Sequence, residues 1–129
     1  MNSSVKVLLV FGSVLVLSRV SDVLRKRIPG ISQMVANTAS EASELLADNH
    51  FDVIVMDIHL PDENGIKFLG NLSLQHPLTT LIVFTSDAEP AIKKICIENG
   101  AHKVFADPSD LTKAIDFIKK YQKTKTKRK

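Results

Sequence analysis

The stretch VIVMDIHLPDENG, from Val53 to Gly65, places a carboxylate directly after four consecutive apolar residues. An uninterrupted apolar run of this length is typical of a strand that is covered on both faces in a parallel sheet. The residues after Asp57 are polar and include Pro61, which favours a loop before the next helix. Asp57 is therefore predicted at the carboxyl end of a buried strand.

Four other apolar runs alternate with segments of helical periodicity. The predicted strands are residues 5–11, 32–37, 52–57, 80–85 and 103–106. Capping residues or a favourable first helical residue mark the predicted helix starts at Ser13, Thr38, Asn64 and Pro90, and residues 110–121 form a fifth amphipathic stretch. Because strands joined through helices form right-handed crossovers, this order predicts a doubly wound α/β fold with a five-stranded parallel sheet between two helical layers.

The composition agrees with one domain and an aliphatic core. The chain has 129 residues, of which 44% are hydrophobic and only 5% aromatic, with no Trp. Its single cysteine, Cys96, excludes an internal disulfide and is interpreted as a buried structural residue.

Positive charge is concentrated at the carboxyl terminus. Residues 1–118 carry 10 Lys and Arg against 14 Asp and Glu, a net charge of −4, whereas residues 119–129 carry 7 Lys and Arg and no acid, a net charge of +7. We expect a folded domain over residues 1–121 and a basic, disordered tail over residues 122–129. Binding of nucleic acid or of a membrane surface through this tail is the weakest of the functional alternatives, because no aromatic residues are interleaved with the charges.

The apolar run from Val7 to Leu17 is too short to span a membrane. No small-residue cleavage site follows it, as a secretory signal would require. We expect a strand, a turn and a helix here, and a cytoplasmic protein.

Ligands of doubly wound sheets bind beyond the carboxyl ends of the strands, where the winding reverses. The candidate residues at that edge are Phe11, Gly12, Asp57, His59, Pro61, Thr85, Ser86, Asp107 and Pro108.

At these positions the chain resembles the receiver domain of bacterial response regulators, which accept a phosphoryl group from a histidine kinase on an aspartate. Asp57 with Pro61 and Gly65 matches the phosphoacceptor motif, Thr85 matches the family's hydroxyl residue, and Gly100, Ala101 and Pro108 match its later turn and proline. The resemblance covers residues 5 to about 121. It implies a flavodoxin-like (βα)5 fold, a non-enzymatic role in two-component phosphorelay signalling, and a cis peptide between Asp107 and Pro108.

Three positions depart from the family's pattern. Phe11 and Gly12 occupy the place of two adjacent acidic residues, Asp107 that of a lysine, and Val104 that of an aromatic switch residue. Asp57 is then the remaining carboxylate for Mg²⁺, so we expect weak metal binding. A carboxylate at Asp107 repels a phosphate that a lysine would attract.

The leading interpretation is a pseudo-receiver that acts through protein–protein contacts, and the alternative is a working phosphoacceptor served by a histidine kinase. Phe11 and Val14 would place apolar surface where a hydrated metal would sit, while Asp57, His59 and Asp107 could instead form a transition-metal site. For a kinase, another regulator or a second copy of the chain, the predicted contact surface contains Ile97, Val104 and Phe117 on the last two helices and the last strand.

Overall fold

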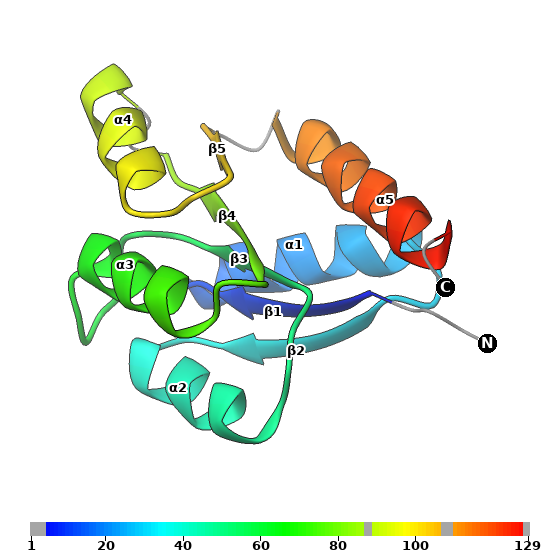
Figure 1. Cartoon of the computed structure of the whole chain (residues 1–129), viewed down its shortest axis with the longest axis horizontal. Coiled ribbons are helices and arrows are strands. Elements are labelled where there is room, and N and C mark those ends of the chain that lie inside the picture. Colours follow the sequence, from blue (N-terminus) through cyan, green and yellow to red (C-terminus); the bar gives the residue numbers. More distant parts are fainter. Residues whose placement is uncertain (1–4, 87–88, 107–109, 128–129) are drawn as a thin grey trace.

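A computed structural model describes residues 5–86, 89–106 and 110–127, with side chains described up to residue 120 (Figure 1). The strands are β1 (Lys6–Val10), β2 (Ser32–Ala36), β3 (Val53–Met56), β4 (Thr80–Phe84) and β5 (Lys103–Phe105). The helices are α1 (Val14–Arg27), α2 (Ala39–Asp48), α3 (Gly65–Gln75), α4 (Pro90–Glu98) and α5 (Leu111–Lys127). The element order is the predicted one, and each strand is shorter than its apolar run by one or two residues. The expected cis peptide at Asp107 and Pro108 lies outside the described residues.

The five strands form one parallel sheet in the order β2-β1-β3-β4-β5, which confirms the predicted flavodoxin-like topology. Strand β1 pairs with both β2 and β3, so that Val10 lies opposite Ala36 on one side and Met56 on the other. The winding reverses between β1 and β3. Asp57, which follows β3, therefore lies at the switch point where such sheets bind ligands.

Helices cover both faces of the sheet, with α1 and α5 on one side and α2, α3 and α4 on the other (Figure 1). Alternate strand residues enter the two cores: Leu9 and Val55 pack with α1 and α5, whereas Leu8 and Ile54 pack with the other three helices. Because both faces are buried, the strands are apolar at every position rather than at every second one.

The predicted caps begin their helices. The Ser13 hydroxyl accepts a hydrogen bond from the Val16 amide at 3.3 Å, and the Thr38 hydroxyl accepts one from the Glu41 amide at 3.0 Å. The Glu41 carboxylate in turn accepts from the amide of Asn37, one residue before the cap, at 2.7 Å. These contacts satisfy backbone donors that the first turn of a helix leaves unpaired.

Two helices differ from the expectation. In α4, the helical spacing predicts that Ile95 faces inward with Cys96, but Ile95 is 39% exposed, because this helix packs on the edge strand β5 and turns only a narrow face to the sheet. Cys96 is buried there, and burial raises the pKa of its thiol. Helix α5 continues to Lys127, where we expected disorder from residue 122. Lys and Gln are good helix formers, and neither Gly nor Pro follows Tyr121 to stop the helix.

The apolar run from Val7 to Leu17 contributes to β1, to the turn at residues 12–13 and to the first turn of α1. It is thus divided between a strand and a helix, as predicted. Within the described ranges, no helix combines the length and the apolar character needed to cross a membrane.

Candidate functional site at the carboxyl edge of the sheet

Asp57 is held at the edge of the sheet by its backbone and by the turn that follows it. Its amide donates to the Val10 carbonyl at 3.0 Å, which continues the pairing of β3 with β1 one residue beyond the strand. Its carboxylate accepts from the His59 amide at 3.1 Å and is half-buried. The side chain is therefore fixed at the switch point and remains accessible.

Thr85 and Ser86 approach Asp57 from the neighbouring strand. The Thr85 amide donates to the Phe105 carbonyl at 3.0 Å, so the pairing of β4 with β5 continues one residue beyond β4. Thr85 is buried and Ser86 is exposed, and both line the same cavity as Asp57. The structure thus brings the predicted carboxylate and hydroxyl residues together.

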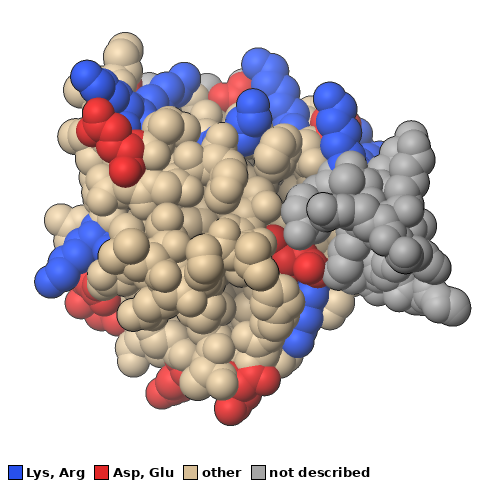
Figure 2. All heavy atoms as spheres, in the orientation of Figure 1, with Lys and Arg blue, Asp and Glu red and all other residues tan. Residues whose placement is uncertain are grey.

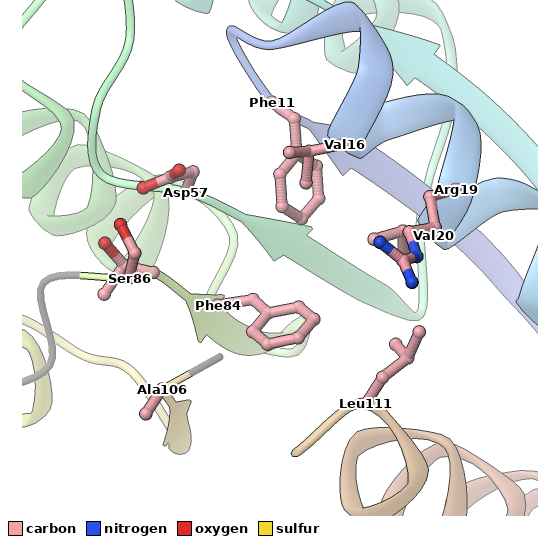
Figure 3. Close-up of a pocket in the computed structure, with 10 residues that line it drawn as sticks. Phe11, Val16, Arg19, Val20, Asp57, Phe84, Ser86, Ala106 and Leu111 are labelled. Carbon is pink, nitrogen blue, oxygen red and sulfur yellow. The ribbon is translucent and has the colours of Figure 1, made fainter. Parts of the chain in front are cut away.

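Phe11 directly follows β1. Its amide donates to the Ala36 carbonyl at 3.1 Å, and its own carbonyl accepts from the Asn37 side chain at 3.1 Å. The phenyl ring is 1% exposed and points into the cavity beside Asp57 (Figure 3). An aromatic ring therefore forms the wall of the site on the side of β1.

Gly12 lies directly against the loop between β3 and α3. A Cβ atom on this residue would be 3.0 Å from the His59 carbonyl oxygen and 3.2 Å from Cδ of Pro61, both tighter than ordinary van der Waals contact. The loop is closed by an isolated antiparallel bridge between His59 and Asn64. Three predicted site residues, Gly12, His59 and Pro61, therefore lie close together. The loop occupies the space that a side chain at position 12 would need.

Asp62 fastens the same loop to helix α2 and was not predicted from the sequence. Its two carboxylate oxygens accept from the amides of Ala39 at 2.9 Å and Ser40 at 3.0 Å. These hydrogen bonds lower the pKa of Asp62 below its ordinary value. An acidic residue in a polar loop was the available signal, but the helix that it reaches becomes known only from the fold.

A cavity of about 190 Å³ opens beside Asp57, between α1 and α5 (Figure 3). It is lined by Phe11, Val16, Arg19, Val20, Asp57, Phe84, Thr85, Ser86, Ala106 and Leu111. Sequence analysis identified Phe11, Asp57, Thr85 and Ser86 but missed the contributions of α1, β4 and α5. It placed Val14 at this wall, whereas Val14 is 66% exposed and Val16 lines the cavity instead. A step of two residues places them on different sides of α1.

The residues around Asp57 fit a hydrated Mg²⁺ ion poorly. Phe11 and Gly12 offer no side-chain oxygen, and the Phe11 ring offers no hydrogen-bond acceptor to the waters that Mg²⁺ retains. No three His, Cys, Asp or Glu side chains of the described residues are grouped closely enough to hold a metal. Asp107 and Pro108, which were predicted at this edge, lie outside the described residues.

The predicted contact surface on α4, β5 and α5 is only partly exposed. Ile97 is 49% exposed, as expected for a contact residue. Val104 and Phe117 are half-buried and pack against the two cores, so the expectation that they are surface residues is wrong for most of their area. The ammonium group of Lys103 lies 5.7 Å from the centroid of the Phe117 ring and covers part of it.

Comparison with known proteins identifies the family. A model of the response regulator receiver domain matches residues 7–119. The chain belongs to this family. Receiver domains are signalling modules of two-component systems and interact with kinases and other regulators.

Relatives of known sequence are much longer than this receiver domain. The protein-glutamate methylesterase/protein-glutamine glutaminase of Hydrogenovibrio crunogenus is 35% identical over 121 residues, which are 92% of this chain and 28% of the relative. The sensory/regulatory protein RpfC of Xanthomonas campestris is 25% identical over 93 residues, 69% of this chain and 13% of that protein. The receiver domain thus corresponds to a minor part of each.

Solved structures share the fold along the whole receiver domain. The CheY-like receiver domain protein from Methanospirillum hungatei superposes with a TM-score of 0.85 at 22% identity and covers 98% of this chain and 100% of its own. The receiver domain of an HD domain-containing protein from Pseudomonas fluorescens superposes with a TM-score of 0.80 at 26% identity, covering 94% and 98%.

Proposed function

We propose that this receiver domain signals by binding a protein partner and does not cycle through a Mg²⁺-dependent phosphate on Asp57. The observation that carries the proposal is the carboxyl end of β1, where a buried phenyl ring and a closely packed glycine stand at the positions that match the family's acidic pair. Neither residue supplies a ligand for the metal.

The absence of these metal ligands should impair phosphoryl transfer, because in this reaction the protein contributes mainly the position of the groups and electrostatic stabilisation. The charge that develops on the transferred group is spread over metal ions and cationic side chains. Here Asp57 has an aromatic neighbour in Phe11, and Asp107 stands where the family's pattern has a lysine. The state of the domain would then be set by its own sequence or by a partner rather than by phosphate.

One observation favours the alternative, a phosphoacceptor served by a histidine kinase. Asp57 and Thr85 line one cavity at the ends of adjacent strands, as the accepting carboxylate and the hydroxyl residue of the family would. A decisive experiment must therefore test the chemistry of Asp57 directly.

The test is incubation of the full chain with acetyl phosphate and Mg²⁺, scored by intact mass, together with beryllofluoride titration followed by NMR. We expect no phosphorylated species and no saturable shifts at Thr85. An Asp57→Asn variant is the control for signal that does not depend on this carboxylate. Stoichiometric phosphorylation that the variant lacks would overturn the proposal in favour of the phosphoacceptor.

For the contact surface we propose helix α4, centred on Ile97. Figure 2 shows that uncharged side chains cover the middle of this face of the molecule, whereas Lys, Arg, Asp and Glu lie over α4 at its margin. Ile97 is proposed as the centre because it is a large apolar residue that is 49% exposed on this helix. Ile97 and Ile95 lie on opposite sides of the buried Cys96 and are both exposed, which makes them a matched pair for mutation.

If Ile97 is at the centre of a contact, Ile97→Asp should reduce self-association or capture by a cognate histidine kinase by at least about tenfold. Ile95→Asp serves as the control for a charge on the other side of the same helix. Sedimentation velocity measures self-association, and surface plasmon resonance measures kinase capture. Equal effects of the two substitutions would rule out a contact centred on Ile97.

A further inference from the structure

We propose that the cavity beside Asp57 is a binding site for a small apolar molecule that carries one positively charged nitrogen group. This inference goes beyond the proposed function and does not depend on it, because it concerns the space between α1 and α5 rather than phosphorylation.

The volume and the apolar lining of the cavity determine the size and the apolar character of the ligand. A closed apolar cavity of about 150 Å³ admits benzene, and the volume here is about 190 Å³. The rings of Phe11 and Phe84 face the space from β1 and β4, and Val20 and Leu111 border it from the helices (Figure 3). One aromatic ring or a short branched chain with a small substituent fills such a volume.

The polar end of the cavity sets the charge of the ligand. Asp57, Thr85 and Ser86 line this end of the cavity, and Figure 3 shows the Asp57 side chain near that of Ser86. One carboxylate with hydroxyl groups nearby matches an ammonium group, which donates in several directions. The aromatic faces of Phe11 and Phe84 attract the same positive charge, whereas hydrated Mg²⁺ would lose water contacts against them.

Arg19 determines the orientation of the bound ligand. Figure 3 shows Arg19 and Asp57 on opposite sides of the cavity, with the two phenyl rings between them. A positive group placed at the Arg19 side would be repelled, and the same group at the Asp57 side is attracted. The positively charged nitrogen therefore points to Asp57, and the apolar body extends toward α1 and α5.

Three probes of similar size separate charge from shape: benzylamine, benzyl alcohol and benzoate. Each is titrated into the full ¹⁵N-labelled chain without Mg²⁺ or phosphodonor, and amide shifts are followed by NMR. We expect benzylamine to shift the amides of Val16, Thr85 and Leu111 and to bind at least about tenfold more tightly than benzyl alcohol. Benzoate should bind more weakly than both.

Two pairs of variants locate the site. Asp57→Asn should weaken benzylamine about tenfold, while Asp48→Asn, which removes an exposed carboxylate at the end of α2, should leave its affinity unchanged. Val16→Phe should fill the cavity and abolish the shifts. Val14→Phe adds the same ring on the exposed side of α1 and should not.

The proposal is overturned if benzoate or benzyl alcohol binds as tightly as benzylamine, if Asp57→Asn binds benzylamine like the wild type, or if Val16→Phe retains the shifts. Because Val16 is 43% exposed, its replacement can be accommodated without unfolding, and the amide spectrum itself reports the fold. If acetyl phosphate phosphorylates the domain and benzylamine still binds as described, the proposed signalling mode is wrong but the proposed binding site stands.

Discussion

The carboxyl ends of β1 and β3 lie side by side in the sheet but carry opposite kinds of side chain. Beyond β3 stands the half-buried carboxylate of Asp57, and beyond β1 the buried phenyl ring of Phe11. Both residues nevertheless donate their amides to the neighbouring strand, at 3.0 Å and 3.1 Å. The backbone position of each residue is thus fixed by hydrogen bonds between strands. These bonds do not depend on whether the side chain is a carboxylate or a phenyl ring.

The largest difference between the two ends should appear in stability. Phe11→Ala removes a fully buried ring and should lower the free energy of unfolding by about 4 kcal/mol. Leu15→Ala, at a residue 83% exposed on α1, is the control and should change it by less than about 0.5 kcal/mol. Urea denaturation followed by circular dichroism measures both. A loss below about 1 kcal/mol for Phe11→Ala would mean that the ring is not part of the core.

The two glycines that border the loop after β3 should also differ. A Cβ at Gly65 would overlap with the backbone carbonyl of Ile58, and we expect Gly65→Ala to cost about 3 kcal/mol. At Gly12 the nearest atom would be 3.0 Å away, so that a small shift of the loop suffices and Gly12→Ala should cost about 1 kcal/mol. The same denaturation series measures both variants. A larger loss of stability for Gly12→Ala than for Gly65→Ala would contradict the packing of the loop described above.

Asp57 itself should matter little for the fold. An Asn side chain at this position can still accept the hydrogen bond from the His59 amide, so Asp57→Asn should change the free energy of unfolding by less than about 1 kcal/mol. Thermal unfolding of the two proteins under the same buffer conditions gives the comparison. A large stabilisation or destabilisation would show that the carboxylate is engaged in the core, contrary to its accessible position.

The smallest effect concerns Asp62 and appears only at low pH. Its pKa is lowered in the folded chain by the amides of Ala39 and Ser40, so the unfolded chain takes up a proton first as the pH falls. The stabilisation from Asp62 is therefore complete above its unfolded pKa of about 4 and is lost as the pH falls toward the folded value. We expect the stability difference between wild type and Asp62→Asn to shrink from pH 6 to pH 2.

Asp48→Asn, at an exposed carboxylate for which no comparable pair of amides is recorded, is the matched control for this series. Its difference from the wild type should vary less over the same range than that of Asp62→Asn. If the two variants follow the same pH profile, the bonds from Asp62 to α2 do not contribute to stability in solution.

The parts of the fold that local patterns specify could be predicted from the sequence. The order of strands and helices along the chain follows from the alternation of apolar runs with capped helices, and Ser13 and Thr38 cap their helices because the acceptor and the donors lie within three residues. The meeting of Asp57 with Thr85 was predictable because parallel strands end at one edge.

Contacts between distant segments were harder to predict. Asp62 bonds to amides more than 20 residues away, and its partner depends on how the loop lies over α2. The cavity combines Val16 with Leu111 from opposite ends of the chain, and periodicity alone does not say that their helices are neighbours. Phe117 was placed on the surface because it is off the main inward stripe, yet a ring of its size reaches the core from the flank of α5.

The contact of Gly12 with the His59 carbonyl has a consequence for how such a site can change by mutation. A carboxylate added at position 12 while the loop keeps its present course would be pressed against the carbonyl oxygen at 3.0 Å from its Cβ, and both oxygens are negatively polarised. If the loop changed its course before position 12 was substituted, Gly12 would lose the residues against which it packs. The residue at position 12 and the course of the loop are therefore coupled, and an acidic residue at position 12 is expected to require a different backbone path at residues 59–61.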